Sequence, residues 1–332
     1  GGRSFCVLGM RLLASPIDAG LVKQQEIAEF LKDLVSIYKP LPYHNAMHGA
    51  DVANGFMSLL NLSPRLRDTP LGPPECSLSS ELNIAACMIA ALGHDVGHPG
   101  YNNSFLASTL APLAVTYNDM SILENFHAAV TFTVLLRPNV RFFARLEDKQ
   151  FADFRKFVVN LILVTDMKTH LDDVASFRLR LTDPSFALAE DYDPGSRPRS
   201  RSKSVCAQPA NPPTATPDDI RQVQFILMKA ADLGHSAKPW RLHQEWTTRI
   251  TEEFHNQGDE ERARGLPVSQ ITDRNGFHLA KSQIGFLQYV AMPLWNEVAH
   301  LDEPQHAGDG FEEVRDACVQ NLEHWQEEAD AG

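Results

Sequence analysis

The sequence predicts an all-α protein, and three observations support this fold class. Its most informative segments carry apolar residues at helical spacing. The chain shows no series of short alternating strands joined by Asn-Gly or Gly-Gly turns. With 332 residues, of which 43% are hydrophobic, it is long enough to bury one large core or two modest ones. We therefore expect many helices and no sheet.

The first two helices are the clearest. In residues 21–38 the apolar residues follow one helical face, and Pro40 and Pro42 end the pattern. Residues 81–95 are apolar on nearly all sides, which predicts a helix buried within the core.

Three later segments complete the helical pattern. Residues 154–170 contain β-branched residues that are also typical of a strand, but the length of the segment favours a buried helix. Residues 220–235 and 242–257 continue the helical spacing.

Residues 191–217 differ from the rest of the chain. They are rich in Pro, Ser and Arg and poor in apolar side chains, so they bury too little surface to offset the entropy of ordering. We expect a mobile surface insertion here. Its Arg/Ser run is typical of a solvated loop, which we favour over a phosphorylation site or an anion contact.

The composition narrows the class of protein. A net charge of −12 argues against a nucleic-acid surface, and no apolar run is long enough to span a membrane. Five scattered cysteines favour free thiols in a reducing, cytoplasmic compartment. The first residues lack an initiator Met, so we expect a fragment whose regulatory domains are missing.

The motif HDVGHPG has the character of a metal site. His94 and His98 are four residues apart, so on a helix they share one face, with Asp95 beside them. Pro99 and Gly100 then end the segment.

Other parts of the chain supply partners for these histidines. His48 follows His44 at the same spacing of four, and Asp232 lies near an expected helix end. The candidate metal ligands are His48, His94, Asp95 and Asp232. Two imidazoles and two carboxylates form a mixed nitrogen and oxygen site, which suits zinc or another first-row divalent ion with positions left for water.

A second ion fits the same site. Asp95 could bridge to a harder ion held mainly through waters, as Mg²⁺ prefers. The side chains expected to hold those waters are His98, Glu124, Thr165 and Asp166. Two ions about 4 Å apart suit displacement at phosphorus, because they generate hydroxide and neutralise the phosphoryl oxygens. His44, one turn before a ligand, suits a general acid.

Each of these residues also has a simpler interpretation. A single histidine on an apolar helix is more often a satisfied polar residue than a ligand, and an aspartate near a helix end is usually a cap. The ordered combination of H-N-x-x-H, H-D-x-x-H-P-G and A-D-L is what makes the metal site specific.

The motifs also resemble a known family. The segments YHNAMHGADV, GHDVGHPGYNNSFL, ILENFH, TDMKTH, ADLGHSAKPW and KSQIGFLQYVAMPLW are similar to the catalytic domain of class I cyclic nucleotide phosphodiesterases, within the HD-domain phosphohydrolases. The similarity runs from about residue 40 to 300. It implies one compact all-α catalytic domain of about sixteen helices, spanning residues 1–332 with a core from about 21 to 330.

The resemblance implies hydrolysis of a 3′,5′-cyclic nucleotide to the 5′-monophosphate, by attack of a metal-bridging hydroxide on phosphorus. The cofactors it implies are Zn²⁺ and Mg²⁺, or Mn²⁺ in place of magnesium. It assigns the zinc to the four candidate ligands, the bridge to Asp95, and protonation of the O3′ leaving group to His44. It also implies a structural hydrogen bond from Asn103.

The resemblance points to a base pocket as well. Gln283 offers both a donor and an acceptor, so its amide could pair with adenine or guanine. Phe286 would stack on one face of the base and Ile250 on the other, with Tyr43 and Met167 at the rim.

Two features flank this pocket. Trp246 and Phe254 share the helix face of Ile250, and we expect their role to be mostly packing within the protein rather than contact with the base. Residues 256–269 correspond to a mobile loop beside the pocket.

Two departures from the family pattern bear on the substrate. His235 stands where many cAMP-selective members have Asn, and a neutral histidine donates and accepts from opposite ring edges. We therefore expect dual use of cAMP and cGMP, with His235 as a packing residue the simpler alternative. Gly97 stands where many members have Asp, with no predicted effect.

Three other functions remain as alternatives. The chain could be a cAMP-selective phosphodiesterase, another HD-domain nucleotide phosphohydrolase, or a nucleotide sensor without activity. Gln283 with Phe286 argues against the second, and the intact ligand set argues against the third.

Overall fold

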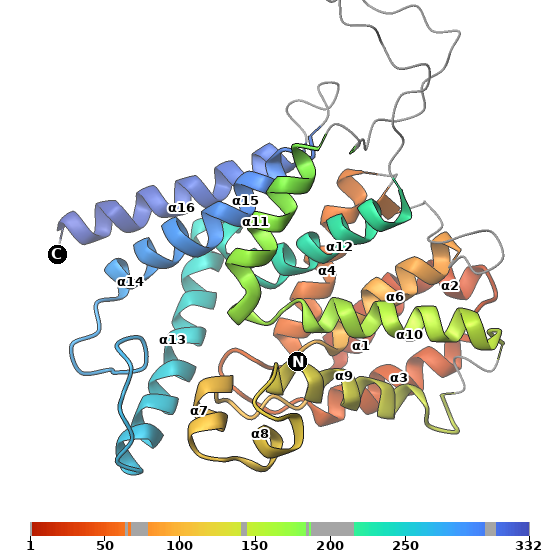
Figure 1. The fold of residues 1–332 in the computed structure, drawn as a ribbon, viewed down its shortest axis with the longest axis horizontal. Coiled ribbons are helices and arrows are strands. Elements are labelled where there is room, and N and C mark those ends of the chain that lie inside the picture. The colour runs from red at the N-terminus through yellow and green to blue at the C-terminus, as the bar shows by residue number, and fades with distance from the viewer. Residues whose placement is uncertain are drawn as a thin grey trace, which may run out of the picture.

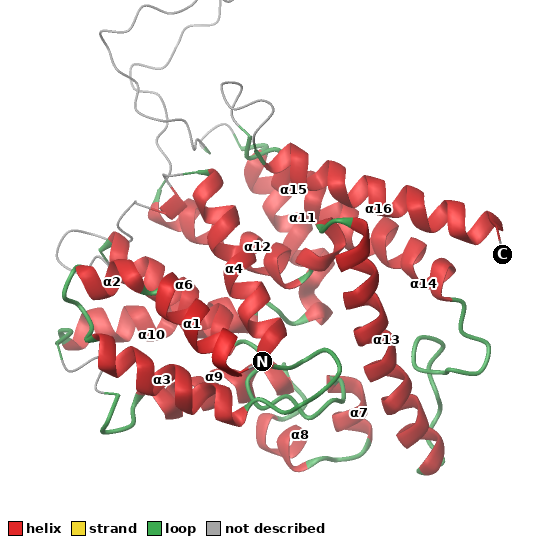
Figure 2. Cartoon of the chain, turned by 180° about the vertical axis from the view of Figure 1, so that it is seen from behind, coloured by secondary structure: helices red, strands yellow, loops and turns green. Residues whose placement is uncertain are grey.

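The computed structural model describes residues 2–63, 66–67, 79–140, 145–183, 186, 216–302 and 310–331. Within these ranges every regular element is a helix and no strand occurs (Figure 2), which confirms the predicted all-α class. None of the described helices is both long enough and apolar enough to cross a membrane.

The N-terminal helices form one side of the molecule (Figure 1). They are α1 (Gly2–Leu12), α2 (Ala14–Asp18), α3 (Gln24–Ile37), α4 (Ala46–Leu62), α6 (Ser80–Gly93), α7 (Asn103–Ser108), α8 (Pro112–Tyr117), α9 (Ile122–Leu135) and α10 (Asp148–Leu163).

The C-terminal helices form the other side, with α12 packed against α4 between the two groups. They are the 3₁₀-helix η1 (Met167–Thr169), α11 (His170–Leu181), α12 (Pro217–Asp232), the 3₁₀-helix η2 (Gly234–Ala237), α13 (Trp240–Ala263), α14 (Leu279–Phe286), the π-helix η3 (Leu287–Ala291), α15 (Met292–Ala299) and α16 (Phe311–Ala331).

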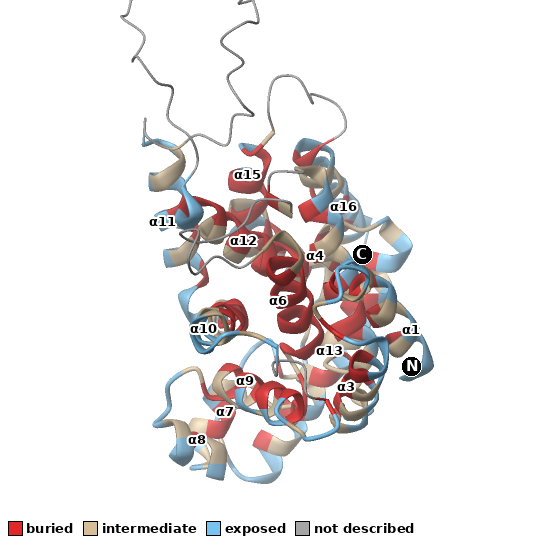
Figure 3. Ribbon diagram, turned by 90° about the vertical axis from the view of Figure 1, so that its right-hand side faces the viewer, coloured by how far each residue is buried: buried red, intermediate tan, exposed pale blue. Residues whose placement is uncertain are grey.

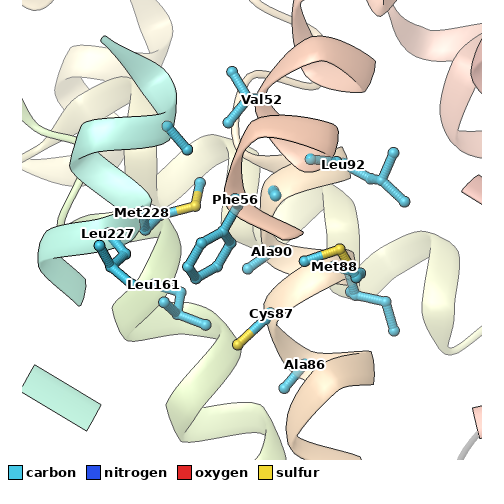
Figure 4. Close-up of a cluster of buried hydrophobic side chains, with 14 of the residues drawn as sticks. Val52, Phe56, Ala86, Cys87, Met88, Ala90, Leu92, Leu161, Leu227 and Met228 are labelled. Carbon is cyan, nitrogen blue, oxygen red and sulfur yellow. The ribbon is translucent and has the colours of Figure 1, made fainter. Parts of the chain in front are cut away.

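Helix α6 runs through the middle of the core, as its apolar surface predicts. Figure 3 shows it buried along its length. Its alanines let α4, α9 and α10 approach closely, and Phe56 of α4 packs near Cys87 and Ala90 (Figure 4). Leu161 of α10 and Met228 of α12 close the cluster. The buried helix therefore gives its C-terminal end a fixed position.

The expected helix over residues 154–170 is wrong at its C-terminal end. Helix α10 ends at Leu163, and Thr165 and Asp166 form a turn before η1. The turn is stabilised because Asp166 caps η1 by accepting a hydrogen bond from the backbone of Lys168, 2.8 Å away. The hydroxyl of Thr165 donates to the carbonyl of Ile162.

The expected loop over residues 256–269 is also partly wrong. Helix α13 continues to Ala263, so the first half of this segment is helical. Its buried residues hold the following loop: Glu261 accepts hydrogen bonds from Gln257 and from the hydroxyl of Thr272, each at 2.8 Å.

The expected insertion lies mostly outside the described residues. Of residues 191–217, only Thr216 and Pro217 are described, and they belong to α12: Thr216 is its N-cap and Pro217 its first residue. At the other end, Phe5 and Leu13 lie in the main core, which therefore begins before residue 21.

Candidate metal centre and active site

The start of α4 positions the first two histidines. Asn45 is the N-cap, and its side-chain oxygen accepts hydrogen bonds from the backbone of Met47 at 2.8 Å and His48 at 3.3 Å. His48 therefore lies in the first turn, with 2% of its surface exposed, and His44 lies just before the helix.

The motif HDVGH forms a turn, so the helix predicted over residues 81–95 ends two residues earlier than expected. Helix α6 ends at Gly93, and His94 is its C-cap. Gly97 has a φ of +79°, in the region that favours glycine, so the helix cannot continue to His98. A side chain at position 97 would also meet the ring of Phe126 at 3.1 Å. His94 and His98 thus do not share a helix face.

The fold nevertheless brings the four predicted ligands together. His48, His94, Asp95 and Asp232 place one nitrogen or oxygen each within 4.8 Å of all the others. Nε2 of His48 lies 3.1 Å from Oδ1 of Asp232 and 3.3 Å from Oδ2 of Asp95. Nε2 of His94 lies 3.2 Å from each of the same two oxygens.

The chemistry of this cluster fits a cation. Nδ1 of His94 lies 2.8 Å from the carbonyl oxygen of Ala91, which only accepts, so the proton of a neutral His94 is on Nδ1. Its Nε2 lone pair then faces the carboxylate oxygens of Asp95 and Asp232. Three acceptors that face one another require a positive charge between them, and a divalent metal ion supplies it.

The pKa values of the same groups agree with this demand for positive charge. Burial lowers the pKa of His94, but the charges of Asp95 and Asp232 together outweigh burial and raise this pKa well above its usual value. Burial raises the pKa of both aspartates, yet the nearby His94 holds each well below its usual range. The two carboxylates are therefore ionised, which is the form that binds metal.

His127 extends the same pattern. Its Nδ1 donates to the carbonyl of Val96 at 2.8 Å, so Nε2 is unprotonated. That atom is buried without a hydrogen-bond partner among the described residues, 3.7 Å from Oδ1 of Asp95. Burial lowers the pKa of His127 to about 4, which keeps the ring neutral.

Glu253 is a site residue that the sequence did not reveal. One carboxylate oxygen lies 2.6 Å from Nδ1 of His44. The other accepts hydrogen bonds from the backbone nitrogens of Tyr43 at 2.9 Å and His44 at 3.1 Å. Glu253 lies seven residues after Trp246 and so on the buried face of α13, but nothing in the sequence separates it from the exposed Glu252.

Glu253 and His98 consequently hold the ring of His44 in one orientation. Its ring stacks on His98 with centroids 4.0 Å apart, and its Nε2 points to Oδ2 of Asp95, 3.9 Å away. Burial lowers the pKa of His44, but Asp95 and Glu253 together raise it above the usual value. Asp95 and Glu253 thus favour the protonated form of the ring.

Three of the expected water-holding residues lie in two neighbouring hydrogen-bond groups. Asn103 donates to both oxygens of Glu124, at 3.2 and 3.0 Å, and accepts from the backbone of Leu123, which is the structural role expected of Asn103. Burial raises the pKa of Glu124 to about 7. Asp166 accepts a hydrogen bond from Ser121 at 2.8 Å, and Thr165 is buried beside it.

The residues expected to bind the base gather around α13 and α14. Oε1 of Gln283 lies 3.3 Å from the hydroxyl of Thr247. The rings of Phe286 and His235 are parallel within 3°, with centroids 5.6 Å apart. Ile250 is half-buried on α13.

The two rim residues differ in depth. Met167 is 46% exposed, as a rim position predicts. Tyr43 is buried, and its ring contacts the rings of His48 and Trp246 with centroids 4.5 and 5.5 Å apart. Tyr43 therefore lies deeper than the rim, where its backbone is fixed by Glu253.

Comparison with known proteins places these features in a family. Residues 43–307 match the family described as 3′5′-cyclic nucleotide phosphodiesterase. The chain is 34% identical to the dual 3′,5′-cyclic-AMP and -GMP phosphodiesterase beta of Plasmodium falciparum (isolate 3D7), over 83% of this chain and 21% of that protein. It is 34% identical to the 3′,5′-cyclic-AMP phosphodiesterase 4C of Mus musculus, over 87% of this chain and 37% of the relative.

A third relative carries a different substrate in its name. The cGMP-specific 3′,5′-cyclic phosphodiesterase alpha of Plasmodium falciparum (isolate 3D7) is 32% identical over 97% of this chain and 30% of that protein. The chain thus spans less than half the length of these relatives.

Proposed function

This chain belongs to the 3′5′-cyclic nucleotide phosphodiesterase family, and we propose that it hydrolyses 3′,5′-cyclic nucleotides to 5′-monophosphates with divalent metal ions. One observation carries the proposal: a cation-demanding cluster of two histidines and two aspartates lies beside His44, whose pKa is raised by Asp95 and Glu253.

The ligand set suits two ions of different character. His48, His94, Asp95 and Asp232 would hold Zn²⁺, since imidazole and carboxylate are ligands that zinc accepts. A second, harder ion, Mg²⁺ or Mn²⁺, would share Asp95 and be held through waters. Those waters would be held by His98, Glu124, Thr165 and Asp166. Such ions, when bound, neutralise phosphoryl oxygens and lower the pKa of water.

His44 supplies the other half of the reaction. Water adds to phosphorus and gives up one proton to solvent, the bond between phosphorus and O3′ breaks, and the O3′ that leaves needs a proton. Nδ1 of His44 is held by Glu253 at 2.6 Å, which leaves Nε2 to deliver its proton to O3′. The ring then takes a proton back from solvent.

The base would bind between α13 and α14. Phe286 and Ile250 would contact the two faces of the base, with Gln283 and His235 at its edge and Met167 at the rim. Among the described residues, the amide of Gln283 has the hydroxyl of Thr247 as its hydrogen-bond partner, and a hydroxyl both donates and accepts, so this contact allows either amide orientation. This supports the use of both cAMP and cGMP.

We also propose a reducing, cytoplasmic location. It is supported by the free thiols of the three described cysteines, Cys6, Cys87 and Cys318.

The substitution Asp232→Asn tests the proposed function. It removes one ligand charge while keeping the shape, so we expect bound zinc to fall by at least about tenfold and turnover by about a thousandfold. Asp33→Asn, which changes an aspartate paired with Arg137 on the surface, should retain both. If Asp232→Asn keeps full turnover and metal content, the proposed site is wrong.

A further inference from the structure

Helix α12 carries a buried lysine in an otherwise apolar run. Lys229 is 2% exposed and lies between Met228 and Ala230, which are fully buried. Lysine is almost never buried to this extent unless its ammonium group is paired. The proposed hydrolysis assigns no step to this positive charge, so its position needs another explanation.

The ammonium group of Lys229 has three acceptors. Two are backbone carbonyl oxygens: it donates to that of Val164 and, at 3.4 Å, to that of Asp166. The third is Oδ2 of Asp173, which lies 2.9 Å away. An ammonium group has three N–H donors and accepts nothing, so these contacts use its full capacity. The end of the side chain is therefore held in one position.

The three acceptors belong to three consecutive elements. Val164 is the C-cap of α10, Asp166 is the N-cap of η1, and Asp173 lies in the first turn of α11. Lys229 thus closes both ends of the turn that carries the side chains of Thr165 and Asp166. A carbonyl group moves with its own residue, so the two carbonyl contacts fix the positions from which both side chains extend.

Lys229 also lies one helical turn before a candidate metal ligand. Asp232 follows it by three residues on α12, so the two are neighbours on one rigid element. Burial is the main cause that raises the pKa of Glu124, and the charges of Asp166 and Asp95 add to it. Glu124 is therefore within electrostatic reach of both the turn and the candidate ligands. Helix α12 carries one ligand together with the ammonium group that holds the turn.

We propose that Lys229 is a positioning residue for the second, water-held metal ion, because it fixes the Thr165–Asp166 turn relative to Asp232. This rests on the proposed function, since it concerns the affinity of the same site for one of its two ions. An ion held mainly through waters depends on where the groups that hold those waters lie. Zn²⁺ would instead be bound directly by four side chains. Lys229 therefore affects the second ion and leaves the zinc in place.

The direct test is the affinity of the zinc-loaded protein for Mn²⁺, measured without substrate from the EPR signal of free Mn²⁺. Lys229→Met removes the ammonium group and keeps an apolar stem. We expect the dissociation constant for Mn²⁺ to rise about tenfold to a hundredfold, as when other groups that orient a metal site are removed. The zinc content per chain should stay at its wild-type value. An unchanged Mn²⁺ affinity, or loss of the zinc, would overturn the role of Lys229.

Two further variants separate this role from a general loss of stability. Leu13→Ala leaves a cavity at a fully buried position in the N-terminal part of the core, so it also destabilises the fold. It should keep the wild-type Mn²⁺ affinity, and an equal loss in this control would overturn the proposal. If Lys229→Met does not fold, Lys229→Gln is measured in its place. Its neutral, shorter side chain cannot replace the ammonium group at all three acceptors, so we expect the same rise.

Turnover gives a second, independent measurement. The Mg²⁺ concentration for half-maximal release of 5′-nucleotide should rise in Lys229→Met by the same factor as the dissociation constant for Mn²⁺, and saturating Mg²⁺ should restore the rate. A rate that stays low at saturating Mg²⁺ would contradict a role in positioning this ion. Wild-type protein that binds no Mn²⁺ beside its zinc would count against the proposed two-ion site itself. Equal Mn²⁺ affinity in the wild type and Lys229→Met would overturn only the role of Lys229.

Discussion

Glu253 and His44 are joined by two contacts, and a third joins Glu253 to Tyr43, although 209 residues separate Glu253 from His44 in the chain. One oxygen of Glu253 lies 2.6 Å from Nδ1 of His44, and the other accepts from the backbone of His44 and Tyr43. The carboxylate thus fixes the ring, its tautomer and the chain that carries it. This pair supports the proposed role of His44 as the proton donor to O3′.

The substitution Glu253→Gln tests this pair through the pH dependence of the rate. Glu253 is one of the groups that raise the pKa of His44, so its neutralisation lowers that pKa. Since the acid must be protonated, activity is lost as pH rises through this pKa. The alkaline limb of kcat/KM should therefore move to lower pH, and kcat should fall about tenfold to a hundredfold.

The matched control for Glu253→Gln is its neighbour. Glu252→Gln changes an exposed carboxylate on the same helix turn and should leave the profile unchanged. An unchanged alkaline limb in Glu253→Gln would show that Glu253 does not tune the acid.

Lys229 stabilises the turn that carries Thr165 and Asp166. Its ammonium group is 2% exposed, lies 2.9 Å from Asp173, and donates to the carbonyl of Val164. Lys229→Met removes the ammonium group, so Asp173 loses its ion-pair partner and the carbonyl of Val164 loses its donor. We therefore expect the free energy of unfolding in urea to fall by about 2–4 kcal/mol.

An exposed lysine nearby provides the control for Lys229→Met. Lys168→Met lies in the adjoining η1 and should change the free energy of unfolding by less than about 0.5 kcal/mol. Equal effects of the two substitutions would contradict the structural role given to Lys229.

Gly258 allows α13 to lie against the loop that follows it. A Cβ at this position would be 2.0 Å from the carbonyl oxygen of Thr272, a backbone atom that cannot turn aside. Gly258→Ala should lower the free energy of unfolding by about 1–3 kcal/mol or more.

The helical Gly55 offers the opposite case. A Cβ there meets only Ala231, at 3.9 Å, so Gly55→Ala should stabilise the protein by up to about 1 kcal/mol through helix propensity. Thermal unfolding of both variants measures the difference. Stabilisation by Gly258→Ala would show that the loop is not held at this distance.

The sequence predicted those parts of the molecule whose signal is local. Helix α6 was predicted because a helix that is apolar on all sides is stable only when it is buried in a core. The four candidate ligands were predicted because histidine and aspartate in short ordered motifs are specific for metal chemistry.

The remaining features depend on contacts that no local pattern records. The turn after Gly93 is set by the positive φ of Gly97, and the end of α10 by the cap that Asp166 provides. Glu253 acquires its proposed role from His44, far away in the chain. A residue type shows what a side chain can do, and only the fold shows what it meets.

We propose that the cluster of His48, His94, Asp95 and Asp232 supports metal-dependent hydrolysis of cyclic nucleotides. The experiment to do first is to measure release of 5′-nucleotide from cAMP and cGMP in parallel, by the chelated protein and after Zn²⁺ and Mg²⁺ are restored. We expect no turnover after chelation and recovery with both nucleotides when the metals return. Undiminished turnover in the chelated protein, or none with metal demonstrably bound, would contradict it.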